Sequence, residues 1–277
     1  MMTTGEPGKK RAGVSGWFSE LDLLLRGELT RVSSLRSGGL DINPGRLSVI
    51  IILLAMIYGV CMGSFAIFRP KGSDPMQLLA SMLKVPLLFY LTLLVTFPSL
   101  YVFNALVGSR LGLGTVVRLL VASLGVLVTV LSSLGPIVAF FSVSTASYPF
   151  MLLFNVVVYA VGGTLGMAFL LQTLHRLSVI DSQPLPRTSP PPLSDSPDAL
   201  EFEGPSGALD PLENRVLSKH VKTVFRLWVI VFALVGAQMG WVLRPFVGNP
   251  NLPFTWFRPR QSNFFQAVLH TIASLFS

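Results

Sequence analysis

Five long apolar runs, none of which holds an acidic or basic residue, dominate this 277-residue chain. A helix that crosses the roughly 30 Å hydrocarbon core of a bilayer needs about 20 apolar residues, because a helix rises about 1.5 Å per residue. Four runs meet that length, and the stem of Arg226 extends the shorter fifth run. The runs cover residues 47–68, 85–107, 119–141, 148–174 and 227–243. We therefore predict an all-α, polytopic integral membrane protein with five transmembrane helices and interfacial amphipathic helices.

The composition agrees with membrane insertion. The chain is 51% hydrophobic and 12% charged, whereas soluble domains are about 25% charged. Its net charge of +8 comes from basic residues scattered around the apolar runs, where they would face anionic headgroups of the lipid bilayer rather than nucleic acid. The one cysteine, Cys61, lies inside the first run, where a lone thiol serves as a small apolar side chain.

The sequence lacks motifs for catalysis or metal binding. The three histidines are far apart, and none pairs with a cysteine or an acid at the spacing of metal ligands. It contains no nucleophile elbow, phosphate loop or dinucleotide-binding turn. Acids inside a membrane usually mark ion-coupled transport, and the five runs hold none. We expect no enzymatic activity, no cofactor and no metal.

The distribution of Lys and Arg predicts the orientation. These residues are concentrated in segments 1–46, 108–118 and 175–226, which five alternating spans place on one side. The more basic side of a membrane protein faces the cytoplasm. We expect a cytoplasmic N-terminus and an outer C-terminus.

Composition also divides the chain into segments. From Phe18 to Leu35 the apolar residues recur every three or four positions, which predicts an amphipathic helix that lies either on the membrane or on the protein's own surface. Residues 181–213 are proline-rich and acidic, and we expect them to be disordered, as a spacer or as a docking segment. The predicted segments are a cytoplasmic N-terminal segment (1–46), transmembrane helices one to four (47–174), a cytoplasmic loop (175–222), transmembrane helix five (223–245), and an outer cap with a short amphipathic helix (246–277).

One helical face at the outer end of the fifth run carries an unusual set of residues. Gln238, Trp241 and Arg244 lie three residues apart, so an amide, an indole and a guanidinium would share this face. Trp256 and Arg258 follow in the outer cap. We interpret these five residues as interfacial anchors or as candidates for contact with a partner protein or a lipid headgroup.

Neutral polar residues and glycines mark the packing of the bundle. Asn104, Asn155 and Gln172 lie in or near the runs, and facing lipid without a partner would cost each several kcal/mol. We expect their side chains to point into the bundle or at another subunit. Pairs of glycines four residues apart allow helices to approach closely. These pairs are Gly59/Gly63, Gly162/Gly166 and Gly236/Gly240.

Two stretches, KVPLLFYLTLLVTFPSLYVFNALVG (84–108) and GAQMGWVLRPFVGNPNLPFTWFR (236–258), resemble an uncharacterised family of bacterial polytopic membrane proteins. This resemblance implies the bacterial cytoplasmic (inner) membrane and no particular activity. The predicted topology is also similar to that of the YIP family of membrane-trafficking proteins. Only topology is carried over, because no Asp-Leu-Tyr-Gly-Pro-like motif precedes the first run.

These observations favour a non-enzymatic role as a structural, assembly or accessory subunit of a membrane complex, with a membrane-protein partner or a second copy of the chain. The alternative is a passive transporter, a channel or a lipid-handling protein. In that case Ser132, Ser133, Asn104 and Asn155 would line a pathway between the spans. An enzyme acting on lipid would need a pair of titratable groups that only the fold could bring together.

Overall fold

The computed structural model describes residues 14–28, 42–68, 75–106, 113–181, 210–249, 252–259 and 262–276. Within these residues the secondary structure is entirely helical. The elements are α1 (Val14–Leu25), α3 (Pro44–Gly63), the 3-10 helix η1 (Ser64–Ala66), α4 (Pro75–Leu106), α5 (Leu113–Ser144), α6 (Tyr148–Asp181), α7 (Asp210–Val242) and α8 (Phe264–Phe276). The predicted all-α class is confirmed. The predicted disordered segment, 181–213, lies almost wholly outside the described residues.

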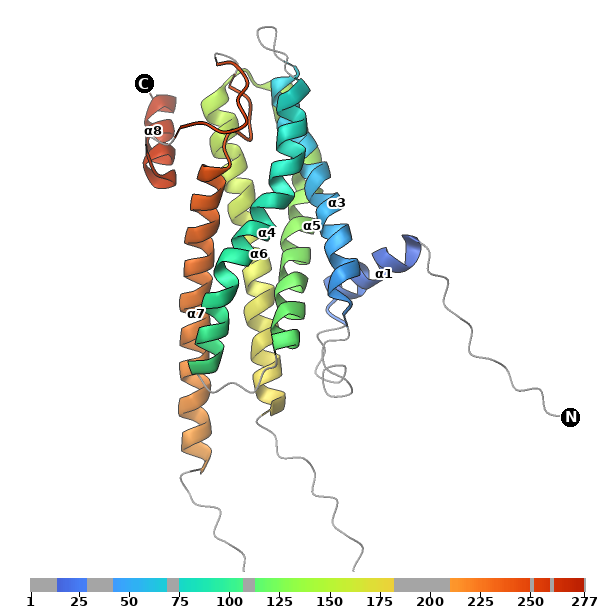
Figure 1. Ribbon diagram of the computed structural model, residues 1–277, viewed down its shortest axis with the longest axis vertical. Coiled ribbons are helices and arrows are strands. Elements are labelled where there is room, and N and C mark those ends of the chain that lie inside the picture. The colour runs from blue at the N-terminus through green and yellow to red at the C-terminus, as the bar shows by residue number, and fades with distance from the viewer. Residues whose placement is uncertain are drawn as a thin grey trace, which may run out of the picture.

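Four helical segments are long and apolar enough to cross a membrane: Pro44–Ala66, Pro75–Ser99, Leu113–Ser144 and Tyr148–Leu174. These match the first four predicted spans. The long helix α7 runs beside α4 and α6 (Figure 1), but its apolar part, Arg226–Val242, is shorter than the other four. Length and composition therefore support four membrane crossings.

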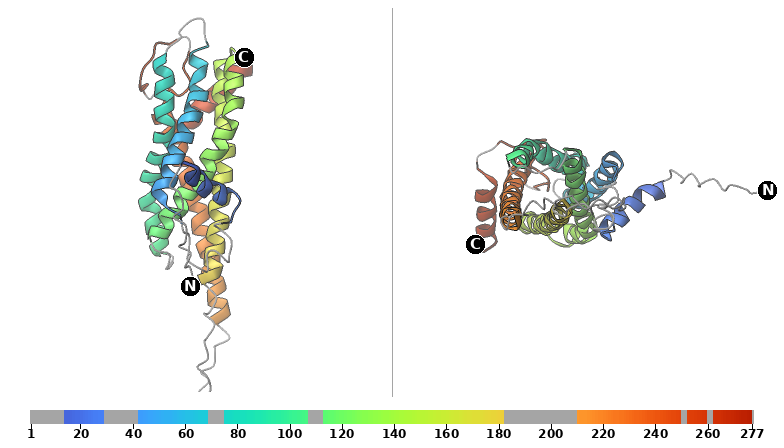
Figure 2. Two further views of the ribbon diagram at one scale, coloured as in Figure 1. Left: turned by 90° about the vertical axis from the view of Figure 1, so that its right-hand side faces the viewer. Right: turned by 90° about the horizontal axis from the view of Figure 1, so that it is seen from below.

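The long helices form an up-and-down bundle. Helix α3 packs against α4 and α5, α5 packs against α6, and α4 packs against α7. The C-terminal helix α8 lies outside the bundle beside the upper part of α7, whereas α1 lies beside the lower part of α3 (Figures 1 and 2). The first and last described helices therefore lie toward opposite ends of the bundle.

Large apolar side chains are exposed along every long helix. Examples on three different helices are Leu53, Leu94 and Phe140, which are 51%, 67% and 64% exposed. A soluble monomer rarely leaves such extended apolar surface in water. In a bilayer the same side chains contact lipid tails, so the exposed surface agrees with membrane insertion.

Helix α1 packs on the protein itself. Leu21 and Leu24 are buried among residues of the bundle core, and α1 contacts α3 and α5. Of the two alternatives left open by the sequence, these contacts favour the protein's own surface. A carboxylate oxygen of Glu20 lies 3.8 Å from an Arg46 nitrogen of α3, which ties α1 further to the start of that helix.

Helix α1 ends earlier than its apolar pattern predicted. The pattern continued to Leu35, but the helix stops at Leu25 because Gly27 adopts a left-handed φ of 71°. The Glu28 N–H donates to the Leu23 carbonyl and the Gly27 N–H donates to the Leu24 carbonyl. These two bonds are those of a Schellman C-terminal cap, which glycine adopts without strain. Residues 29–41 lie outside the described part of the chain.

The first turn of the short C-terminal helix α8 is capped by side chains. The Asn263 side chain accepts from the Gln266 N–H at 2.8 Å, and the Gln266 side chain accepts from the Asn263 N–H at 3.3 Å. This reciprocal pair is a capping box. Helix α8 packs against α6 and α7 and leaves Phe265 and Leu269 exposed.

Two glycine pairs sit where helix backbones touch. A β-carbon on Gly59 would lie 2.6 Å from the Ser81 carbonyl oxygen, and one on Gly63 would lie 3.0 Å from the Ser81 β-carbon, so α3 and α4 are in close contact. Gly162 and Gly166 meet α5 in the same way, at Leu131 and Leu127. The third pair differs, because β-carbons at Gly236 and Gly240 would make only ordinary contacts with α4, at 3.5 and 3.9 Å.

The close contact of α3 with α4 predicts a difference between two identical substitutions. Gly59→Ala forces a methyl group against the α4 backbone and should lower the free energy of unfolding by about 1–3 kcal/mol. Gly163→Ala in α6 meets nothing within 4 Å and should leave stability unchanged or slightly raised. Thermal unfolding of both variants in the same detergent measures the difference. Equal stability of the two variants would contradict the close contact.

Candidate functional site

Segment 243–262 folds over one end of the bundle and is called the cap; residues 250–251 and 260–261 lie outside its described part. Three polar residues of α4, at spacings of four and three, hold it. Gln77 donates to the Pro245 and Phe246 carbonyls at 3.2 and 3.1 Å, and the Ser81 hydroxyl donates to the Phe246 carbonyl. These bonds satisfy main-chain groups that would otherwise be buried without partners.

Lys84 is the third of these residues and is buried. Its ammonium group donates to the Pro245 carbonyl at 3.2 Å and to the Trp256 carbonyl, and it lies 5.1 Å from the centre of the Phe257 ring. A buried ammonium is tolerated only where carbonyl oxygens or ring faces replace its water. Lys84 therefore draws both ends of the cap onto α4.

The predicted face of α7 holds the other side of the cap. Arg244 stacks on the Trp241 ring, with its guanidinium carbon 3.5 Å from the ring centre, and donates to the Pro259 carbonyl at 2.6 Å. Trp241 donates to the Ser262 carbonyl. Gln238 accepts from the Phe264 N–H at 3.5 Å, which is a long bond. These three side chains bond the chain's own C-terminal part, a role that the sequence did not predict.

The cap packs tightly. Leu243 and Val247 are buried. A β-carbon on Gly248 would lie 2.7 Å from Ala66 Cβ and 3.0 Å from Gln77 Cγ, so only glycine fits there without movement. The Arg244–Pro245 peptide bond is cis. The cap is thus an ordered part of the bundle, fastened to both α4 and α7.

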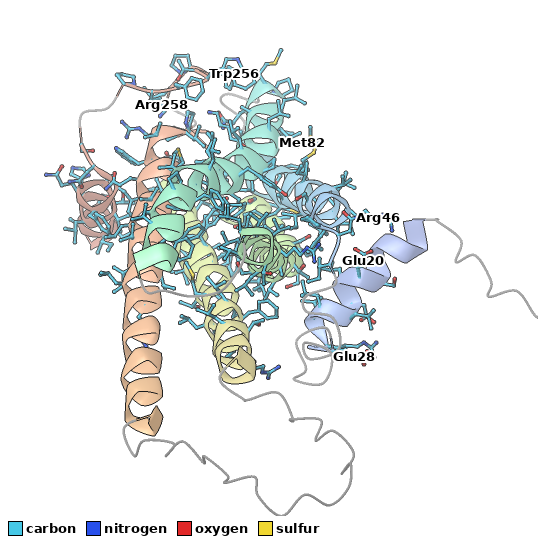
Figure 3. The ribbon with its side chains drawn as sticks, turned by 60° about the horizontal axis from the view of Figure 1, so that its bottom comes forward. Glu20, Glu28, Arg46, Met82, Trp256 and Arg258 are labelled. Carbon is cyan, nitrogen blue, oxygen red and sulfur yellow. The ribbon has the colours of Figure 1, made fainter. Side chains whose placement is uncertain are left out.

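Three cations gather in and under the cap, and none of them forms an ion pair with an acid of the described residues. Arg258 lies within electrostatic range of Lys84 and of Arg244, and partial burial together with the charge of Arg258 lowers the pKa of Arg244. The described acidic residues all belong to α1 and the turn after it, the end of α6 or the start of α7, at the opposite end of the bundle. Figure 3 shows Arg258 and Trp256 at the cap, far from Glu20 and Glu28.

A hollow of about 530 Å³ opens beside these cations. It is lined by Val242, Phe257, Arg258 and Pro259. Trp256 and Phe257 lie next to each other and are 46% and 58% exposed. Exposed aromatic rings beside basic residues are typical of the headgroup layer of a membrane.

The predicted intramembrane amides divide into three cases. Asn155 points into the bundle, where its oxygen accepts from the Tyr58 hydroxyl at 3.0 Å and its nitrogen donates to the Met151 carbonyl at 2.8 Å. Gln172 does not point into the bundle but is exposed. It lies within three residues of the end of the span, where a long side chain can reach the interface. The Asn104 side chain lies outside the described part of the structure.

Sequence reasoning missed the α4 half of the site. Neither Gln77 nor Lys84 is among the candidates that the sequence pattern singles out. Their alignment with Ser81 on one face of an otherwise apolar helix was the available signal, but the carbonyls that they bind come from more than 160 residues later in the chain. Only the fold brings these groups together.

Among the described residues, no group of three or more His, Cys, Asp or Glu side chains could hold a metal ion. Comparisons with protein-family models, with curated proteins and with solved structures found no match to this chain.

The α4 contacts predict that the cap loosens when Gln77 is lost. Gln77→Leu keeps the volume but removes two donors from buried carbonyls, which should cost about 1–2 kcal/mol and speed amide hydrogen exchange between Arg244 and Pro259. Gln172→Leu changes an exposed amide on α6 in the same way and should have no effect on the cap. Exchange measured by mass spectrometry in nanodiscs tests both, and equal protection in the two variants would contradict this role for Gln77.

Proposed function

We propose that this chain is a non-enzymatic integral membrane protein with five crossings that serves as a structural or accessory subunit of a membrane complex. The proposal is supported by one observation: polar side chains within the described part of the chain bond other groups of the same chain. Asn155 bonds Tyr58 and the α6 backbone, and Gln238 bonds the start of α8. These groups hold the protein together, and no reacting pair is formed by them.

The use of the polar groups also weighs against a passive pathway. Ser133 is exposed on α5 and donates to the Val130 carbonyl of its own helix, whereas Asn155 is buried and bonded. A pathway needs its polar groups on one shared lining, free to exchange partners with water. Ser133 and Asn155 face different surroundings and do not form one.

The fifth crossing is supported by the two arginines that flank the apolar part of α7. Arg226 and Arg244 are 18 positions apart, and the helix from Arg226 to Val242 covers 16 of them, which corresponds to about 24 Å at 1.5 Å per residue. That length is close to the roughly 30 Å of hydrocarbon, and both stems extend toward the headgroups. Since α7 also packs against α4 and α6, we place it across the membrane with them.

Five crossings predict termini on opposite sides, with the N-terminus in the cytoplasm. In a Cys61→Ser background, Thr3→Cys should react with an impermeant maleimide only after the cells are opened, and Ser277→Cys should react in intact cells. The reason is that basic segments stay in the cytoplasm. Labelling of both positions in intact cells, or of neither, would contradict an odd number of crossings.

We place the contact with the partner on α7. Leu227, Ile230 and Leu234 are 52%, 56% and 46% exposed and lie on one helical face. The side chains of α7 that bond the cap are used within the chain, so this apolar ridge is the part of α7 left for another transmembrane helix. Membrane helices associate through such packing rather than through a hydrophobic driving force.

A bulky substitution on this ridge should separate partner contact from lipid contact. Ile230→Trp keeps an apolar surface that lipid tolerates but changes its shape, and it should reduce the yield of a stoichiometric membrane partner about tenfold in gentle purification. Leu53→Trp, on the equally exposed face of α3, should leave the yield unchanged. Quantitative mass spectrometry of both preparations tests this. An equal yield with both variants, or the absence of any stoichiometric partner, would remove the proposal.

A further inference from the structure

We infer that the cap contains a binding site for a phosphate-bearing anion, formed by Arg258 with Arg244 and Lys84 at its back. The inference assumes that the bundle lies in a membrane, and it does not depend on the accessory role. A phospholipid headgroup and a soluble phosphate ester present the same chemistry to these residues.

The charges at the cap favour a bound anion. Arg258 lies within electrostatic range of both Lys84 and Arg244, and none of the three forms an ion pair with an acid of the described chain. Like charges held together in partly buried positions repel one another, and the repulsion is poorly screened there. A bound anion would remove that repulsion, and the described chain supplies no carboxylate at this end of the bundle.

The hydrogen-bond donors that lack an acceptor at the cap also favour a bound anion. The Lys84 ammonium and the Arg244 Nη2 already donate hydrogen bonds to main-chain carbonyls. The Arg244 Nε is buried, and no group in the described part of the chain accepts its hydrogen bond. Arg258 makes no hydrogen bond to any other described residue. Donors that a ligand in the hollow can reach thus remain on Arg258, and a guanidinium is the side chain best suited to bind phosphate oxygens in pairs.

The position of Arg258 at the hollow favours a lipid phosphate. Arg258 lines the hollow of about 530 Å³ together with Val242, Phe257 and Pro259, so the site offers a cation beside apolar walls. Trp256 and Phe257 are exposed next to it, as expected of rings in the headgroup layer. A phosphate at that depth, with its glycerol and acyl chains directed along the bundle, fits this combination better than a polar solute would.

The experiment uses the purified full-length chain, without partners, in nanodiscs of phosphatidylcholine containing about one-fifth phosphatidylglycerol. Native mass spectrometry counts the phosphatidylglycerol molecules retained when the protein is released. Arg258→Gln should lower retention about tenfold, since one charge-assisted contact is lost. Arg258→Lys should keep much of it. Arg226→Gln, the same change on an exposed arginine at the other end of the apolar part of α7, should retain as much as the unaltered chain.

A parallel arm distinguishes the two sources of phosphate. Inorganic phosphate at millimolar concentration is added to protein in phosphatidylcholine alone, and thermal unfolding is recorded. Stabilisation of the unaltered chain but not of Arg258→Gln supports a site for soluble phosphate, whereas retained phosphatidylglycerol without that response supports a headgroup site. Equal behaviour of Arg258→Gln and Arg226→Gln in both arms would overturn the inference. Hydrogen exchange of the cap in Arg258→Gln shows that the cap is still folded. Because no partner is present, these outcomes are independent of the test on Ile230.

Discussion

The close contact between α3 and α4 at Ser81 positions everything built above it. Gly59 and Gly63 let the α4 backbone approach α3 until a β-carbon would overlap the Ser81 carbonyl. That contact fixes the height and rotation of α4. It therefore also positions Gln77 and Lys84, which lie about one helical turn before and after Ser81. Ser81 itself donates to the cap. In lipid, helices gain little from hiding apolar surface, so backbone proximity of this kind sets their register.

The register of α4 against α3 also explains why the cap is ordered. The described residues between 243 and 259 form no helix, and irregular backbone at the edge of a membrane is stable only if its carbonyls and N–H groups are bonded. Groups on both sides of the cap supply those bonds: Gln77, Ser81 and Lys84 from α4, Trp241 from the end of α7, and Arg244 from the cap itself, two residues beyond α7. A shift of either helix by one residue would rotate its donors away from the cap. The cap thus depends on helix packing that lies well below it.

The sequence predicts those parts of this structure that depend on local pattern. Hydropathy runs identify four spans, and Asn263 with Gln266 identifies the start of α8. It fails where a distant partner or a backbone conformation decides. The left-handed Gly27 ends α1 although the apolar pattern continues. The spacing of Gln238, Trp241 and Arg244 groups these three residues, but their partners at Pro259, Ser262 and Phe264 belong to a chain reversal that no periodicity encodes.

The cap also refines the argument from charge. Positive-inside counting compares numbers of basic residues, and the predicted orientation would place six on the outer side: Arg69, Lys71, Lys84, Arg244, Arg258 and Arg260. Two of these, Lys84 and Arg244, are fixed by main-chain carbonyls, and Arg258 lines a hollow beside them. Lys84 and Arg244 therefore contribute to the fold of the cap. Arg258 makes no hydrogen bond within the described chain, and for it we propose a phosphate-bearing ligand.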